Sequence, residues 1–150
     1  MPRKRPTVAD LKALKGKGQR TMLRYFTLDE AAAAERAEID IASVPPALVS
    51  HQRYRDVAPG VFTMTGKTHL EYGAPEEYLK FSGEMLQAGA DALYCSVSLK
   101  TVELLAREYI PIVGHVGLVP ARATWTGGFR AVGKTAEDAL KLFHECRRYQ

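Results

Sequence analysis

The sequence lacks any long hydrophobic run, and this absence is the first constraint on its class. A membrane-spanning helix needs about 20 consecutive apolar residues, and no stretch of the chain approaches that length. The basic start has no apolar core behind it, as a secretory signal would require. Cysteine is also scarce: Cys95 and Cys146 are the only two, too few for a disulfide framework. We therefore expect a cytoplasmic protein with reduced thiols and no membrane partner.

Positive charge is concentrated in the amino-terminal segment. Residues 1–24 contain eight Lys and Arg side chains against one acid, Asp10. Such an arm can contact nucleic acid or an acidic partner. This one has no aromatic residue between its charges and no recognition motif, so we expect no nucleic-acid partner. Apolar residues at positions 8, 11 and 14 favour a short amphipathic helix. The predicted organisation is a basic arm with a short helix at 1–20, followed by one domain at 21–150.

Short apolar runs alternate with helical patterns along that domain. Strands are expected at 21–26, 39–44, 61–65, 90–96 and 109–113. Helices are expected at 27–38, at 75–88, from 98 and from 135, with a short helical turn within 47–60. Strands that alternate with helices in this way indicate a parallel sheet with helical crossovers. Five βα units fit either a doubly wound sheet or part of an eight-unit barrel, and the pattern does not distinguish the two.

The segment from Ile110 to Lys134 carries the most distinctive chemistry. Its apolar, β-branched start ends in Gly114 and His115, and a glycine-rich stretch follows before a helix signal at Thr135. A buried parallel strand delivers a polar side chain to its carboxyl end in this way, with a loop folding over it. We predict that His115 lies at the functional edge of the sheet.

The same segment carries a resemblance. The run Ile-Pro-Ile-Val-Gly-His-Val-Gly-Leu-Val-Pro at 110–120, with Gly-Gly-Phe-Arg at 127–130 and Gly-Lys at 133–134, resembles the ketopantoate hydroxymethyltransferase (3-methyl-2-oxobutanoate hydroxymethyltransferase) family. The similarity extends through 72–76, 85–91 and the amino-terminal strand and helix. It implies a partial (β/α)8 barrel of the phosphoenolpyruvate mutase and isocitrate lyase superfamily, with about five βα units.

The resemblance also implies a reaction. Enzymes of this family act in pantothenate synthesis. They use Mg²⁺ to chelate a small α-keto acid, α-ketoisovalerate, and add the one-carbon unit of methylenetetrahydrofolate to its enolate. A hard cation on carboxylate ligands stabilises the enolate as charge moves onto oxygen.

The chain departs from the family at the positions that carry this chemistry. Where the family has Gly-Asp-Ser after the second strand, this chain has Pro-Pro-Ala at 45–47. The second metal-binding aspartate corresponds to Gly66, the substrate-binding lysine to Tyr94, and an acid near the metal to Ser96. The general-base glutamate would lie beyond residue 150. His115 matches the family's substrate-contacting histidine, and we do not expect the family's Mg²⁺ site here.

A different metal site is one alternative. His69, Glu71 and His115 would all lie at the carboxyl ends of strands. Two histidines and one carboxylate suit a first-row transition metal better than Mg²⁺. The other interpretation is that His69 and Glu71 are solvated loop residues. Four basic residues near the glycine-rich loop are also candidates to meet an anionic substrate, or are simply solvated: Lys67, Arg122, Arg130 and Lys134.

Two functions from different classes follow. In the first, the chain is a hydroxymethyltransferase whose metal and base are restored by substitute residues or a partner. In the second, it is a catalytically silent relative that binds an α-keto acid or a protein partner through His115 and its loop. An open parallel sheet that ends at its fifth strand leaves an edge and an apolar face to be covered, so we also expect a homo-oligomer.

Overall fold

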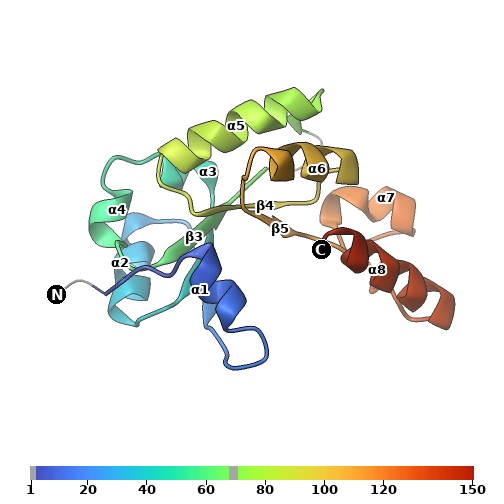
Figure 1. Ribbon diagram of the computed structural model, residues 1–150, viewed down its shortest axis with the longest axis horizontal. Helices are drawn as coiled ribbons and strands as arrows, with labels where there is room; N and C mark the ends of the chain where they lie inside the picture. The colour runs from blue at the N-terminus through green and yellow to red at the C-terminus, as the bar shows by residue number, and fades with distance from the viewer. Residues whose placement is uncertain (1–2, 68–70) are drawn as a thin grey trace.

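The computed structural model describes residues 3–67 and 71–150 (Figure 1). Its centre is one sheet of five parallel strands, β1 Met22–Arg24, β2 Ile41–Val44, β3 Phe62–Thr65, β4 Ala92–Cys95 and β5 Ile112–Gly114. The helices are α1 Val8–Ala13, α2 Leu28–Arg36, α3 Pro46–Val49, α4 Tyr54–Val57, α5 Pro75–Gln87, α6 Leu99–Arg107, η2 Pro120–Arg122, α7 Ala123–Thr126 and α8 Ala136–Arg148.

The strand order decides between the two predicted architectures. A doubly wound sheet reverses its strand order at a switch point. Here every strand pairs in parallel with the next one along the chain, in the order β1-β2-β3-β4-β5. Consecutive parallel strands joined by helical crossovers are the repeating unit of a (β/α)8 barrel. The chain is therefore an α/β protein whose sheet is like part of such a barrel, as the resemblance implied.

The two faces of the sheet are covered differently. Figure 1 shows α5 and α6 on one side of the sheet and α1 on the other. The helix-covered outer face contributes Ala42, Val44 and Leu93 to the main core. The opposite face, called here the inner face, carries a smaller cluster of Phe62, Met64 and Ala92, against which Val8 and Leu11 of α1 pack. In a closed barrel the inner face lines the interior; here α1 packs against part of it.

Several element boundaries differ from the predicted ones. The first strand is confined to Met22–Arg24 and the fifth to Ile112–Gly114. The fifth strand begins late because Tyr109 takes a left-handed backbone conformation, φ 56°, directly after α6. The loop after β5 contains two short helices, η2 and α7, that the glycine-rich sequence did not indicate. Gly127 ends α7 with φ 80°, a conformation that glycine adopts without strain.

The basic arm binds the domain's own acidic side chains. Arg3 lies 3.9 Å from Glu35, Arg5 lies 3.3 Å from Asp91, and Arg20 lies 3.1 Å from Asp40. Asp40 and Asp91 directly precede β2 and β4, so these ion pairs fix the arm across the amino ends of the strands. Three of the eight Lys and Arg side chains of residues 1–24 are therefore paired with carboxylates of the same chain.

The two cysteines are free thiols. Cys95 is buried in the outer-face core, and burial raises the pKa of its thiol. Cys146 is exposed on α8. Among the residues that the structure describes, no helix is long and apolar enough to cross a membrane.

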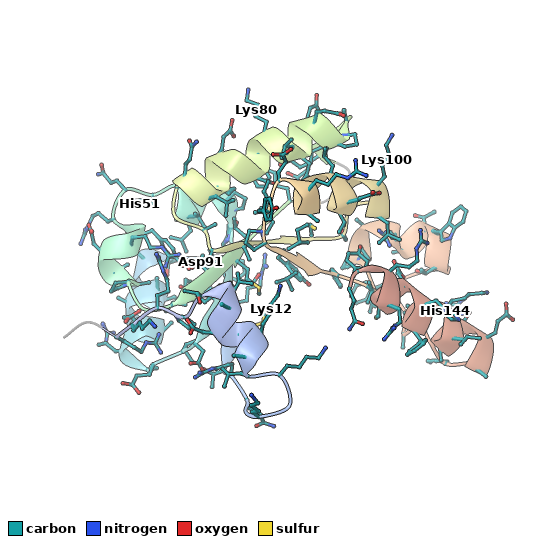
Figure 2. The ribbon with its side chains drawn as sticks, in the orientation of Figure 1. Lys12, His51, Lys80, Asp91, Lys100 and His144 are labelled. Carbon is teal, nitrogen blue, oxygen red and sulfur yellow. The ribbon has the colours of Figure 1, made fainter. Side chains whose placement is uncertain are left out.

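An arginine and an aspartate join β3 to β4 at their amino ends. Arg55 Nη2 lies 2.7 Å from Asp91 Oδ2, and the same oxygen accepts the backbone N–H of Thr63 at 2.7 Å. The guanidinium of Arg55 also donates to the carbonyls of Gly89 and Val61. Both charged side chains are mostly buried, so removing one leaves the other without its compensating charge. Asp91 lies beside the amino-terminal segment (Figure 2).

Asp91→Ala is expected to lower the free energy of unfolding by about 2 to 4 kcal/mol, because it leaves the Arg55 guanidinium and the Thr63 N–H unpaired. The matched control is Glu103→Ala, which removes the exposed Glu103–Arg107 pair on α6 and is expected to cost less than about 0.5 kcal/mol. Urea denaturation measures both. Equal losses in the two variants would contradict the structural role of the Arg55–Asp91 pair.

Candidate functional site

His115 lies where the sequence predicted it, directly after β5 at the carboxyl edge of the sheet. Its backbone N–H donates to the Cys95 carbonyl at 2.8 Å, which continues the ladder between β4 and β5. Its ring stacks on that of Tyr94, with centroids 5.4 Å apart and an interplanar angle of 19°. Tyr94 packs against the inner-face cluster, so the half-buried imidazole also lies over the inner face. Its role in substrate binding stays a prediction.

A second polar group on the same face was not singled out by the sequence pattern. Arg24, the last residue of β1, donates from Nη1 to the Ser43 hydroxyl at 3.0 Å. Ser43 lies beside Arg24 in the strand register and is only 3% exposed. The signal was available: an arginine ends the otherwise apolar Met-Leu-Arg strand, and alternation along a strand fixes the face on which it lies.

The residues that end the strands and directly follow them include no acid. The strand ends at 24–27, 43–47, 64–67, 94–98 and 113–117 contain no Asp or Glu. Mg²⁺ is held by carboxylates and other oxygen ligands, and no carboxylate stands at the positions that correspond to the family's ligands. The donor set at the edge therefore does not fit the ion that the family implies.

The backbone conformation at Gly66 also excludes a carboxylate ligand from this position. A Cβ atom added at Gly66 would overlap the carbonyl oxygen of Tyr94 on the neighbouring strand. Any side chain at this position, aspartate included, requires the ends of β3 and β4 to move apart. The position that corresponds to the family's second metal-binding aspartate thus accepts only glycine in this conformation.

The alternative metal site combines residues from the loops after β3 and β5. His69 lies outside the described residues. Within the described part of the chain, no group of three or more His, Cys, Asp or Glu side chains is arranged to hold a metal ion. The idea that His69, Glu71 and His115 converge on a transition metal stays a prediction.

Three of the four basic residues near the glycine-rich loop have partners within the protein. Arg122 donates to the Ser96 carbonyl at 2.7 Å and lies 3.5 Å from Glu145, which ties the loop to β4 and to α8. Arg130 donates to the Thr126 carbonyl at 2.9 Å. Lys67 lies over the rings of Tyr72 and Phe81. The contacts of Arg122 and Arg130 hold the loop, and none of these contacts is with His115.

The loop and the last helix extend away from the sheet. Figure 1 shows α7 and α8 side by side, beyond α6. Trp125 on α7 is 92% exposed, so it is not a packing anchor in this conformation. A cavity of about 300 Å³ lies between the starts of α5 and α6, lined by Tyr72, Tyr78, Ser96, Ser98, Thr101 and Arg122 among others. His115 is not one of its lining residues.

The order of the parallel strands and the position of His115 directly after β5 define the class of the protein. It is a barrel-type α/β protein, a class whose sites lie at the carboxyl ends of parallel strands. A solved structure of a rubisco-like protein from Burkholderia fungorum matches 97% of this chain and 41% of its own, with a TM-score of 0.55 and 14% identity. At that identity the likeness concerns the fold alone.

Sequence comparison identifies the family. The model of the ketopantoate hydroxymethyltransferase family matches residues 57–150. A 3-methyl-2-oxobutanoate hydroxymethyltransferase of Pyrobaculum islandicum is 40% identical over 76 residues, 49% of this chain and 29% of that protein. A second, of Aliivibrio fischeri, is 28% identical over 107 residues, 69% of this chain and 41% of that protein. The chain belongs to the ketopantoate hydroxymethyltransferase family, and the matched segments span less than half the length of these relatives.

Restoring the inherited ligand should damage the protein rather than rebuild the site. Gly66→Asp is expected to lower the free energy of unfolding by about 2 kcal/mol or more, because the new Cβ overlaps the Tyr94 carbonyl. The matched control is Gly83→Ala on α5, where an added Cβ meets nothing within 4 Å; it should raise stability by up to about 1 kcal/mol. Thermal unfolding and Mg²⁺ calorimetry check both. A stable Gly66→Asp variant that binds Mg²⁺ would refute this account.

Proposed function

We propose that this chain binds a small α-keto acid at the carboxyl edge of the inner face and does not by itself carry out hydroxymethyl transfer. The proposal rests on a contrast at this edge between the position that matches the family's substrate-binding histidine and the positions that match its metal ligands. His115, the residue that matches the family's substrate-contacting histidine, lies half-buried against Tyr94. The positions that correspond to metal ligands carry no carboxylate.

The chemistry of enolate formation also favours binding of the keto acid without catalysis. Removing a proton next to a carbonyl requires a positioned base and stabilisation of the developing oxyanion. The strand ends at 24–27, 43–47, 64–67, 94–98 and 113–117 offer no carboxylate for either role. An imidazole N–H is well suited to donate a hydrogen bond to a keto oxygen. Binding of the keto acid therefore requires fewer functional groups than enolate formation does. His115, at the carboxyl edge of the inner face, can supply one of them.

A working hydroxymethyltransferase is the second candidate. The relatives that match this chain carry that activity in their names, and methylenetetrahydrofolate and Mg²⁺ come with it by family membership. In this case substitute residues, or a partner that brings the metal ligands and the base, would complete the site. The two candidates differ in whether the chain labilises the 3-proton of the keto acid.

Isotope exchange separates the candidates. We expect no exchange of the 3-proton of α-ketoisovalerate above the protein-free rate with Mg²⁺, Mn²⁺, Co²⁺ or Zn²⁺, but saturable binding in ligand-observed NMR. His115→Ala should weaken this binding roughly fivefold or more, because a hydrogen bond is lost. His144→Ala is the matched control, since His144 is exposed on α8 (Figure 2). Exchange that depends on His115 would establish the enzyme instead, and no saturable binding would refute the proposal.

We also propose that the chain self-associates. Apolar side chains remain exposed on the two edge strands of the sheet, Met22 and Leu23 on β1 and Val113 on β5. Unpaired, apolar strand edges are surfaces that proteins cover. A second copy of the chain offers the same edges and can cover them.

Light scattering coupled to size-exclusion chromatography is expected to give a mass of at least twice 16.6 kDa. Leu23→Glu on β1 should shift the protein toward the monomer, because a charge on the edge disfavours pairing. Leu140→Glu, at an exposed apolar position on α8, is the control and should leave the mass unchanged. A monodisperse monomer for the unsubstituted chain would count against self-association.

A further inference from the structure

We infer that the guanidinium of Arg24, rather than a metal ion, holds the carboxylate of the bound α-keto acid. This inference rests on the proposed function and names the group that recognises the charged end of the ligand. It assigns to β1 a role that the family resemblance does not supply. The site consists of Arg24, Ser43, Tyr94 and His115.

The fold fixes the face on which Arg24 lies. The next residue, Tyr25, is 1% exposed in the outer-face core, where its hydroxyl lies 2.9 Å from that of Tyr54. Arg24 is the last residue of β1, and it pairs with Ser43, which pairs with Met64 of the inner-face cluster, so Arg24 lies over the inner face. Its contact with the buried Ser43, which lies beside Met64 in the register, also places the guanidinium there.

Two contacts hold the guanidinium without neutralising it. The Ser43 hydroxyl accepts one N–H, and the Phe26 ring lies 5.2 Å from the guanidinium carbon. Among the described residues Arg24 forms no ion pair, whereas Arg3, Arg5 and Arg20 of the same arm each have a carboxylate partner. The positioned charge on Arg24 therefore has donors left for a ligand, since a guanidinium carries five N–H groups.

The surroundings of Arg24 favour an anion. At the carboxyl ends of β1 and β2, residues 24–27 and 43–47 include the cation Arg24 and no Asp or Glu. Glu30, in the first turn of α2, is already engaged by the backbone N–H groups of Phe26 and Thr27. The Arg24 guanidinium repels a divalent metal ion and attracts a carboxylate.

The dimensions of the edge suit a small ligand. The Arg24 guanidinium contacts β2 and the His115 ring stacks on β4. These strands are separated by two strand spacings, on the order of 10 Å between backbones. Side chains from both ends project over this gap, so a keto acid of a few carbons can meet Arg24 with its carboxylate and His115 with its keto oxygen. Arginine binds a carboxylate through two parallel N–H donors, which fixes the orientation of the acid.

Calorimetry of α-ketoisovalerate binding tests the inference, with EDTA or with Mg²⁺ present. Binding should be equally tight in both. Arg24→Gln should weaken it at least about tenfold, and Arg24→Lys less, because lysine keeps the charge but loses the paired donors. The control Lys100→Gln removes an equal charge from the outer surface of α6 (Figure 2) and should leave the affinity unchanged. Circular dichroism checks that each variant is folded.

A neutral analogue provides a second readout. The amide of the same acid, 3-methyl-2-oxobutanamide, has the same shape without the charge, so its binding should be weak and insensitive to Arg24→Gln. Loss of acid binding in EDTA, or wild-type affinity in Arg24→Gln, would overturn the role of Arg24 while leaving the proposed function standing. The first of these results would point to the metal site at His69, Glu71 and His115. No binding by the unsubstituted chain would refute the proposed function itself, and this inference with it.

Discussion

The junction between β3 and β4 is the constraint on which the rest of the structure depends. At its amino end, Asp91 joins the backbone of β3, the Arg55 guanidinium and the Arg5 side chain of the arm. At its carboxyl end, Gly66 lies so close to the Tyr94 carbonyl that no side chain fits between them. The same junction therefore attaches the arm, joins β3 to β4 and shapes the edge where a ligand would bind. A close strand approach that stabilises the sheet also excludes an inherited metal ligand.

The charge at the edge has changed along with its shape. In a site built around Mg²⁺, carboxylates hold the ion and the ion attracts the acidic substrate. Here the strand ends carry arginine, lysine and histidine and no carboxylate. A guanidinium can hold a carboxylate without an ion, but it does not polarise a carbonyl oxygen as a directly bound cation does. Under the proposed function, this difference would let the edge recognise a keto acid without forming its enolate.

Much of the fold was accessible from the sequence, because βα alternation, capping residues and prolines are local signals. The capping boxes at Thr7 and Thr27 and the end of β2 at Val44 before Pro45 and Pro46 are local in this sense. The choice of barrel over doubly wound sheet was not accessible, because strand order depends on pairing between distant segments. The position of His115 followed from its place after an apolar run. Arg24 was missed because its environment is built by Ser43 and Phe26, and the pairing of the arm with Glu35, Asp40 and Asp91 was missed for the same reason.

A crystal structure of the chain soaked with α-ketoisovalerate and Mg²⁺ is the most direct measurement of the central claim, that a fixed guanidinium has replaced a metal ion at this edge. The account predicts density for the acid on the inner face, with its carboxylate oxygens within hydrogen-bond distance of Arg24, its keto oxygen near His115, and no cation between ligand and protein. An acid that chelates a metal ion away from Arg24 would contradict it.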